Sequence, residues 1–366
     1  MSLWRRTSST AAAATDAGEP AARTSPTIRA GLIGVGKMGI SHYAILGAHP
    51  RVTMSAVCDS ASYITSALRK HTGIDTFTDY RTMIDSAPLE CVFVATPTST
   101  HFDAAAYALE RGLHVFVEKP LCLDPVDSRR LADLARAKRR ANQVGYHHRF
   151  IGTFQETRRL VRAGAIGEVY HVSGSAFGPV VTRPKGGSTW RARKAEGGGC
   201  LHDYASHVVD LMNLIVGPPE RVLGAHLRRI HSRDVEDAVY ATFRYPGGAS
   251  GQLETNWSDD SHRKMSTTVA VYGTRGKIVA DRQECRVHLR AGAGFEDYPA
   301  GWTIRYITDL QAPVAYYLRG EEYSAQIDTF LDAVVRGTPE HENSFASASE
   351  TDHVIDMIAR AAQREG

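Results

Sequence analysis

The feature that most constrains the fold is a glycine motif near the front of the chain, Gly34-Val35-Gly36-Lys37-Met38-Gly39. An apolar run over residues 28–33 precedes it and predicts a buried strand, and helix-compatible sequence follows it. Strand, glycine turn and helix in this order favour a dinucleotide-binding unit over incidental glycines. Gly34 would allow the tight turn, Gly36 would let a pyrophosphate approach the backbone, and Gly39 would let the helix pack on the sheet. We therefore expect this loop, including Lys37 and Met38, to bind the cofactor.

An acidic residue follows at the position where such units bind the adenosine ribose. The strand predicted over residues 52–58 ends at Asp59, twenty positions after Gly39. A carboxylate there hydrogen-bonds the ribose hydroxyls of NAD and repels the 2′-phosphate of NADP, which is usually bound by an Arg. No Arg follows Asp59 until Arg69. The sequence therefore predicts NAD in preference to NADP.

The pattern of strands and helices divides the chain in two. Up to about residue 148, apolar runs alternate with helical segments, which predicts an α/β fold with a doubly wound parallel sheet. After that, hairpin-linked strands and a few helices predict an α+β domain with an open, mainly antiparallel sheet. The length of 366 residues also suits two domains. We assign residues 1–26 to a disordered tail, 27–148 to a Rossmann domain, and 149–366 to a substrate-binding and oligomerisation domain.

Composition argues against several classes of partner. The net charge is only +3, which gives no general reason to expect binding to nucleic acid or to a membrane surface. No apolar run is long enough to span a bilayer. The five cysteines are scattered and include no C-x-x-C pair, which favours a reduced, cytoplasmic protein without a structural zinc site.

Two loops after predicted parallel strands carry candidate site residues. Ligands of such sheets lie outside the carboxyl ends of the strands. Glu118-Lys119-Pro120 follows one strand, and Lys119 could donate to a substrate oxygen or move a proton, although a surface turn is the usual place for a Lys. The second loop could contact the nicotinamide ribose or simply cap a helix; its candidates are Thr96, Pro97, Thr98 and His101.

A third candidate follows the glycines Gly197-Gly198-Gly199. Asp203 and His207 are four residues apart on a predicted helix, so their side chains share one face. A His beside an Asp suits proton transfer at neutral pH. Two alternatives stay open, in which Asp203 only caps the helix or His202 and His207 bind a metal, although no established metal-binding pattern is present.

Taken together, these motifs resemble the glucose–fructose oxidoreductase, inositol dehydrogenase and rhizopine-catabolism (Gfo/Idh/MocA) family over about residues 27–363. The resemblance rests on their order along the chain. The set comprises Gly34–Gly39, Thr96–His101, Glu118-Lys119-Pro120, Gly145-Tyr146-x-x-Arg149-Phe150, Gly167-Glu168-Val169, the glycines before Asp203, His207 and Asp210, and Gly273-Thr274-Arg275-Gly276.

The resemblance implies oxidation or reduction of a secondary alcohol of a sugar or cyclitol with NAD(P), by a homodimer or homotetramer assembled through the open sheet. It implies catalytic roles for Lys119, Asp203 and His207, and a cis peptide bond before Pro120. We also expect Tyr146, Arg149 and Trp190 to contact substrate. The alternatives are a non-catalytic NAD-binding sensor and an NAD-dependent glycosidase or lyase with a transient oxidation.

The loop before Gly197 is unusually basic. It contains Arg183, Lys185, Arg191, Arg193 and Lys194. A solvated, mobile loop is the simpler interpretation. A clamp for an anionic substrate, such as a nucleotide-activated sugar of amino- or deoxysugar synthesis, is the functional one.

Overall fold

The computed structural model describes residues 27–182, 190–314, 317–338 and 341–365. The predicted tail over residues 1–26 lies outside the described residues. The first half forms a six-stranded parallel sheet in the order β3-β2-β1-β4-β5-β6. Its strands are β1 (Ile28–Ile33), β2 (Val52–Cys58), β3 (Asp75–Phe77), β4 (Cys91–Val94), β5 (His114–Val117) and β6 (Asn142–Val144). The order reverses beside β1, which places the carboxyl ends of β1, β4 and β5 along one edge.

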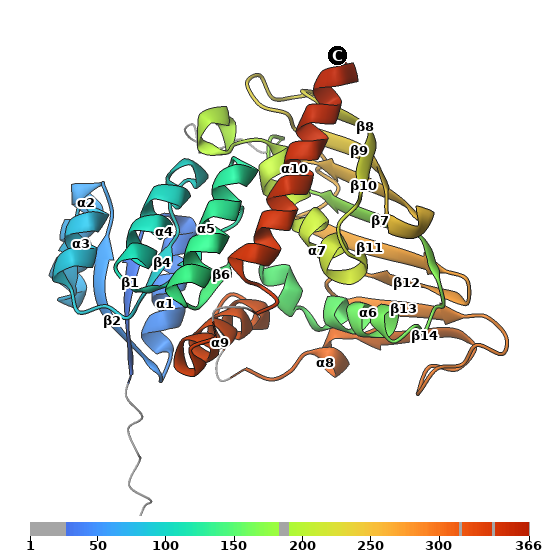
Figure 1. The fold of residues 1–366 in the computed structure, drawn as a ribbon, viewed down its shortest axis with the longest axis horizontal. Coiled ribbons are helices and arrows are strands. Elements are labelled where there is room, and N and C mark those ends of the chain that lie inside the picture. The colour runs from blue at the N-terminus through green and yellow to red at the C-terminus, as the bar shows by residue number, and fades with distance from the viewer. Residues whose placement is uncertain (1–26, 183–189, 315–316, 339–340, 366) are drawn as a thin grey trace, which may run out of the picture.

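Helices cover both faces of this sheet (Figure 1). On one face lie α3 (Tyr80–Ser86), α4 (His101–Glu110) and α5 (Pro125–Lys138), whose apolar residues share a core with β4 and β5. On the other lie α1 (Lys37–Ala48) and, from the far end of the chain, α9 (Glu321–Arg336). Phe330 of α9 packs against Phe93 and Phe116 at ring-centroid distances of 5.3 and 5.8 Å. The division of the chain at residue 149 stays a prediction.

The second half forms an eight-stranded sheet in the order β14-β13-β12-β11-β7-β10-β9-β8. Within the described chain, β7 and β10 pair in parallel and the other neighbouring strands pair antiparallel. The predicted mainly antiparallel sheet is therefore confirmed. The strands are β7 (Val169–Phe177), β8 (Arg221–Arg228), β9 (Ala238–Arg244), β10 (Ser250–Asn256), β11 (Ser266–Gly273), β12 (Gly276–Ala280), β13 (Glu284–Leu289) and β14 (Gly301–Tyr306).

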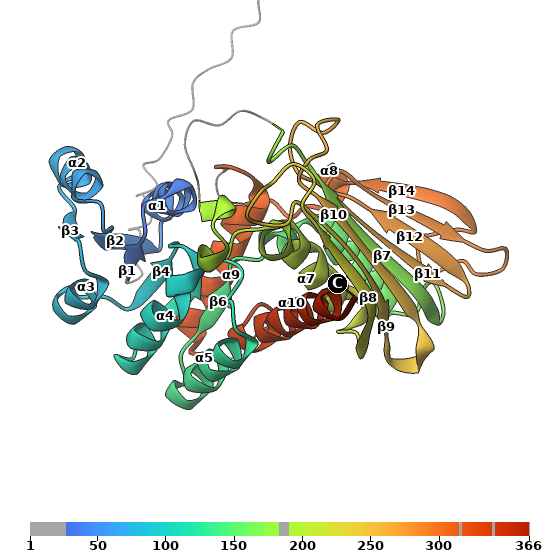
Figure 2. The same ribbon diagram turned by 90° about the horizontal axis from the view of Figure 1, so that it is seen from above.

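Among the described residues, helices pack on one face of this sheet and leave the other uncovered, as Figure 2 shows from above. They are α6 (Gly152–Arg162), α7 (Ser206–Val216) and α10 (Phe345–Glu365), and a short α8 (Ile307–Leu310) follows β14. α10 continues past the sheet to pack on α5, so it contacts both halves of the molecule. This arrangement brings the carboxyl edge of the first sheet against the start of α7, where Lys119 contacts Asp203.

Some elements differ from the sequence predictions. The helix predicted from Asp203 begins instead as a π-helical turn, η5 (Leu201–Ala205), that runs into α7. The sequence pattern did not predict α2 (Ser62–Thr72), β3, α3 or β14.

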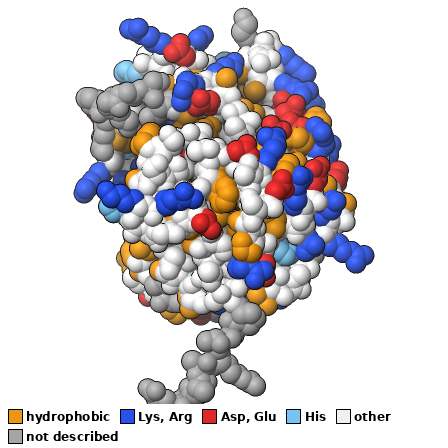
Figure 3. Space-filling model, turned by 90° about the vertical axis from the view of Figure 1, so that its left-hand side faces the viewer, with side chains coloured by type: hydrophobic (Ala, Val, Ile, Leu, Met, Phe, Trp, Pro, Cys, Tyr) orange, Lys and Arg blue, Asp and Glu red, His pale blue; other side chains and the backbone are white. Residues whose placement is uncertain are grey.

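In the described part of the chain, no helix is both long and apolar enough to cross a membrane. On the face formed by the first half, basic and acidic side chains are interspersed (Figure 3).

Candidate active site

The glycine loop (Gly34–Gly39) has the shape that a dinucleotide requires. Gly34 has a φ of +92°, and a Cβ there would lie 2.8 Å from the carbonyl oxygen of Ala95. A Cβ on Gly39 would lie 1.9 Å from the carbonyl of Gly34, so the helix packs directly on the turn. A Cβ on Gly36 would meet nothing within 4 Å. The loop therefore leaves open space at Gly36, in front of the N-terminus of α1, where a pyrophosphate fits.

Asp59 closes this part of the site. One carboxylate oxygen accepts the N–H of Val35 at 2.7 Å, and the other accepts the N–H of Ala61 at 2.9 Å. The acid is therefore held beside the glycine loop at the end of β2. Lys37 is exposed and Met38 half-buried in the first turn of α1. These residues fit NAD, and their contacts with it stay predictions.

His101 joins the two loops that follow β4 and β5. Its ring nitrogens lie 3.0 Å from the carbonyl oxygen of Thr96 and 2.9 Å from that of Pro120. The expected cis peptide bond between Lys119 and Pro120 is present. Burial lowers the pKa of His101 despite these carbonyls. Thr98 begins a short helical turn, and its side chain packs closely on Gly197. A Cβ built on Gly197 would lie only 3.0 Å from the Thr98 side chain. The loop after β4 therefore touches the glycines of the second half.

The centre of the site is a buried carboxylate between two cations. Lys119 Nζ lies 2.8 Å from Oδ1 of Asp203 and 3.1 Å from its carbonyl oxygen. Arg191 Nε lies 2.8 Å from Oδ2 of the same carboxylate. Asp203 is only 4% exposed. Burial alone would raise the pKa of Asp203, but the charges of Lys119 and Arg191 hold it well below its usual range. The carboxylate is therefore ionised at neutral pH.

His207 lies one helical turn further on and is almost fully buried. Its ring centroid is 4.6 Å from that of His148, 5.0 Å from that of His147 and 6.0 Å from that of Tyr146. Burial, followed by the charge of Lys119, lowers the pKa of His207 well below its ordinary value. The imidazole is therefore neutral, and its Nδ1 has no hydrogen-bond partner among the described residues. A neutral imidazole has a free ring nitrogen that can accept a proton.

The Glu118 side chain contacts the helix that follows the glycine loop. Its Oε1 lies 2.7 Å from Nε2 of His42 in α1, and both side chains are buried. Burial would raise the pKa of Glu118, but the hydrogen bond with His42 and the nearby positive charges, Lys119 among them, together lower it. Glu118 therefore ties the loop after β5 to the helix that follows the glycine loop. Its contact with the cofactor stays a prediction.

Arg149 and Trp190 have defined surroundings. Arg149 forms a buried bidentate ion pair with Asp210, with its Nε 2.8 Å from Oδ2, and also bonds Ser347 and the carbonyl of Glu342 in the segment leading into α10. Trp190 is half-buried, with the Arg191 guanidinium 4.8 Å from its ring centroid. The predicted contacts of Tyr146, Arg149 and Trp190 with substrate stay predictions.

Four residues near this centre were missed by the sequence analysis. His147 stacks on Tyr323 of α9 with ring centroids 4.4 Å apart, and His148 lies against His207. Arg282, which follows β12, lies close enough for its charge to lower the pKa of His207. The two histidines follow the carboxyl end of β6, as Lys119 follows β5, and that position could have signalled them. Tyr323 and Arg282 reach the site only through tertiary packing.

The basic loop is only partly described. Arg183 and Lys185 lie outside the described residues. Arg191 points at Asp203, whereas Arg193 pairs with Glu196 at 2.9 Å and is mostly exposed. Within the described ranges no group of three or more His, Cys, Asp or Glu side chains could hold a metal ion.

Comparison with known proteins agrees with this geometry. Residues 28–146 match the oxidoreductase family with an NAD-binding Rossmann fold, and residues 154–279 match the Gfo/Idh/MocA C-terminal domain. The dTDP-3,4-didehydro-2,6-dideoxy-alpha-D-glucose 3-reductase of Streptomyces violaceoruber is 32% identical, and the alignment covers 62% of this chain and 67% of that protein. The chain belongs to the Gfo/Idh/MocA oxidoreductase family.

Other relatives match over nearly the whole length. The levoglucosan dehydrogenase of Pseudarthrobacter phenanthrenivorans is 26% identical over 92% of this chain and 97% of that protein. A levoglucosan dehydrogenase structure in complex with NADH and L-sorbose superposes with a TM-score of 0.83 at 24% identity, over 93% of this chain and 98% of that one, which supports the fold. As a Gfo/Idh/MocA member, the protein is an NAD-binding oxidoreductase.

Proposed function

We propose that the protein is an NAD-dependent dehydrogenase or ketoreductase acting on a secondary alcohol of a sugar or cyclitol. The observation that carries the proposal is the buried contact of Lys119 with Asp203 beside His207, at the sheet edge next to the glycine loop. The named activities of relatives support it, since both the dTDP-sugar reductase and levoglucosan dehydrogenase act on sugars by name. NAD would be held by the glycine loop, Asp59 and the loops after β4 and β5.

Each residue at the centre has a defined part in the proposed reaction. The glycine loop and Asp59 would hold NAD, which would supply the hydride chemistry. His207 accepts the hydroxyl proton of the substrate, and Lys119 stabilises the negative charge that develops on that oxygen. Asp203 holds the amino group of Lys119 in place through the 2.8 Å contact. In the reductive direction, the product oxygen would receive its proton back through His207.

The cofactor is NAD rather than NADP in this proposal. The Asp59 carboxylate at the end of β2 is held toward the glycine loop by the N–H of Val35. A fixed negative charge there would repel a 2′-phosphate and accept hydrogen bonds from ribose hydroxyls. We also place the protein in the cytoplasm, because its cysteines are all buried and unpaired.

Nucleotide-activated sugars are the subclass to test first. The relative at 32% identity acts, by name, on a dTDP-linked sugar. Next to the site, the segment from Trp190 carries three basic residues, Arg191, Arg193 and Lys194. Asp203 and Glu196 pair with the two arginines, so the remaining positive charge of this segment favours an anionic ligand. Substrate KM should then rise steeply with salt. A KM that does not change with salt would point to a free sugar or a neutral cyclitol.

The proposal is tested by NADH formation across free sugars, inositols and nucleotide sugars. His207→Ala and Lys119→Ala should each lower kcat by about 10²–10⁴-fold and leave NAD affinity nearly unchanged. If both variants keep most of their turnover, the assignment is wrong. NAD binding without turnover on any substrate would favour a sensor, and a product of unchanged redox state would favour a glycosidase or lyase.

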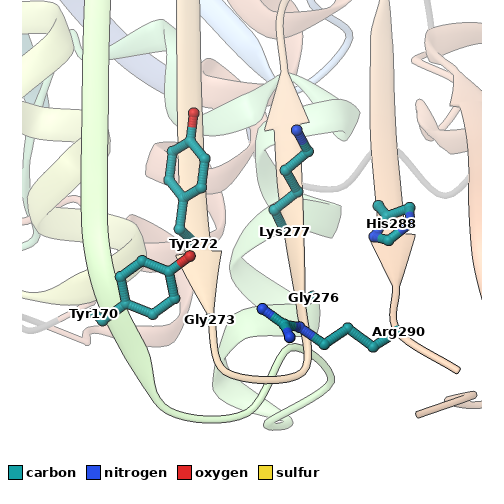
Figure 4. A pocket seen from close by; sticks show the side chains of 7 residues that line it. All are labelled: Tyr170, Tyr272, Gly273, Gly276, Lys277, His288 and Arg290. Carbon is teal, nitrogen blue, oxygen red and sulfur yellow. The ribbon is translucent and has the colours of Figure 1, made fainter. Parts of the chain in front are cut away.

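The uncovered face of the second sheet supports assembly. Trp302, Ile304 and Tyr306 on β14 are 55%, 45% and 52% exposed on this face. Tyr272, Lys277, His288 and Trp302 stand directly opposite one another across β11 to β14. Figure 4 shows a pocket alongside this row, which Tyr272, Lys277 and His288 line together with Tyr170 and Arg290. Aromatic and Arg side chains on one exposed face are typical of interfaces, and we infer that a second copy of the chain covers it in a homodimer or homotetramer.

A further inference from the structure

We propose that Glu236, in the loop between β8 and β9, is a positioning residue for the reaction. It fixes the glycine turn (Gly197–Gly199) and, through that turn, the carboxylate of Asp203. The inference rests on the proposed function, because it concerns how the Lys119–Asp203 contact is held. Glu236 comes from a different part of the chain and lies 33 positions after Asp203, a separation that follows from the numbering.

Glu236 holds the start of the π-helical turn by two hydrogen bonds. Its Oε1 accepts the N–H of Leu201 at 3.0 Å, and its backbone carbonyl accepts the N–H of Cys200 at 2.9 Å. These N–H groups belong to the first residues of a helix, which have no partner within the helix itself. The carboxylate and the carbonyl of one residue therefore anchor two successive peptides directly before Asp203.

The glycine turn is shaped around this carboxylate. Gly199 has a φ of +112°, and a Cβ at this position would lie 2.1 Å from Oε1 of Glu236. The carboxylate thus occupies the space that any other side chain at Gly199 would fill. The requirement for glycine at this position follows from the presence of Glu236 as well as from the backbone conformation.

The same turn controls both partners of the catalytic ion pairs. The N–H of Gly199 donates to the carbonyl of Arg191 at 3.1 Å, and the N–H of Asp203 donates to the carbonyl of Gly199 at 3.2 Å. Arg191 and Asp203 are the two residues whose side chains meet at 2.8 Å beside Lys119. A shift of the turn would therefore move the carboxylate relative to the ammonium group of Lys119.

The loop that carries Glu236 is itself fixed. The neighbouring Asp237 is fully buried, and its carboxylate accepts the N–H groups of Ile230, His231 and Ser232 at 2.6 to 2.8 Å. The N–H of Trp257 donates to the carbonyl of Asp237 at 2.7 Å. Glu236 therefore stands on a well-anchored loop of the second sheet, and from there its side chain reaches the turn that precedes Asp203.

The test compares Glu236→Ala with Glu236→Gln. The alanine variant loses the acceptor for Leu201 and should lower kcat by about tenfold to a hundredfold, with the KM for NAD changed by less than about twofold. The glutamine variant keeps an oxygen acceptor and should retain most of the wild-type kcat. Equal losses in both variants, or no loss in the alanine variant, would overturn the proposal.

A matched control separates positioning from simple instability. Ile278→Ala in β12 removes a fully buried side chain away from the turn and should lower the Tm without changing kcat. If Ile278→Ala lowers kcat as much as Glu236→Ala at a similar decrease in Tm, instability explains the effect and the proposal is wrong.

A double-mutant cycle tests the route through Asp203. In an Asp203→Asn background, Glu236→Ala should cause much less further loss of kcat, and the two decreases in Tm should not add. The Tm cycle needs no substrate, so it still decides the proposal if the wild-type protein oxidises none of the sugars tried. Additive Tm decreases would overturn the positioning role, whereas an inactive wild type with coupled Tm values would overturn only the proposed function.

Discussion

Asp203 Oδ1 lies 2.8 Å from Lys119 Nζ, although 84 residues separate the two in the chain. The other oxygen of the same carboxylate binds Arg191 at 2.8 Å. One buried negative charge thus compensates two positive charges contributed by different parts of the chain. This arrangement explains why the carboxylate is ionised despite its burial, and it makes Asp203 the residue on which the charge balance of the site depends.

Removing this charge should weaken both activity and stability. In Asp203→Asn, Lys119 and Arg191 would face each other without a counter-charge, so we expect a loss of roughly 3 kcal/mol in the free energy of unfolding. We expect kcat to fall by about 10²-fold or more. Urea unfolding and NADH formation measure the two effects. Arg193→Gln, which breaks only an exposed pair with Glu196, serves as control and should change stability by less than about 1 kcal/mol. Equal effects in the two variants would contradict the central role of Asp203.

The pH profile should show that His207 is neutral well into the acid range. Burial and the charge of Lys119 place its pKa well below the ordinary value. A base must be unprotonated, so kcat/KM for oxidation should be lost only as the pH falls below about 6.5, the ordinary pKa of His. Initial rates measured about every half pH unit between pH 5.5 and 8 would show whether kcat/KM is lost in this way. A midpoint at or above the ordinary value would argue that another group acts as the base.

Asp352 should make stability depend on pH. Its carboxyl is fully buried in α10, where Oδ2 accepts hydrogen bonds from Cys122 N–H at 3.0 Å and Ser128 O–H at 2.6 Å. Burial raises its pKa to about 7, and nearby Asp210 adds to the shift. The folded protein therefore holds this proton between about pH 4 and pH 7 while the unfolded chain releases it, so stability should decrease across that range by at most roughly 4 kcal/mol and then level off.

Asp352→Asn isolates this contribution, because it keeps an oxygen acceptor and cannot titrate. The wild-type protein should lose more stability than the variant between pH 5 and pH 8, values that bracket the pKa of about 7. Urea unfolding at both pH values measures the difference. An identical pH dependence in the two proteins would show that Asp352 does not titrate in this range.

The sequence predicted the site residues at the carboxyl edge of the first sheet better than it predicted the residues that surround them. β1 and β2 match the strands predicted over residues 28–33 and 52–58, because the glycine turn and Asp59 mark where these β-rich runs end. The segment over 62–86 carries no predicted element, since α2 buries only Thr65 and offers no apolar run that would mark a core helix. Lys119, Asp203 and His207 came from motifs, but the π-helical turn did not, and its first residues are bonded to Glu236 from another loop. Likewise, nothing local shows that Tyr323 will stack on His147.

Asp59 should determine the choice of cofactor. Asp59→Asn keeps an acceptor for the N–H of Val35 and removes the charge that repels a 2′-phosphate. We expect kcat/KM with NADP to rise by about tenfold and kcat/KM with NAD to fall by a similar factor, since hydrogen bonds to a charged group are each worth roughly 1.5–3 kcal/mol. Steady-state rates with both cofactors measure the change. A wild-type preference for NADP would refute the assignment at the outset.

Charge placed on the uncovered sheet face should break the proposed assembly. Trp302 and Ile304 are half-exposed on β14, so replacing both with Asp costs the single chain little stability but would bury unpaired charges between two copies. Light scattering should show the wild type as a dimer or tetramer and the Trp302→Asp, Ile304→Asp variant as a monomer. Tyr63→Asp alters an aromatic side chain that is 76% exposed on α2, and this control should keep the wild-type mass. If the wild type is a monomer, the proposed assembly is wrong. If the double variant still assembles, the contact between copies lies elsewhere on the molecule.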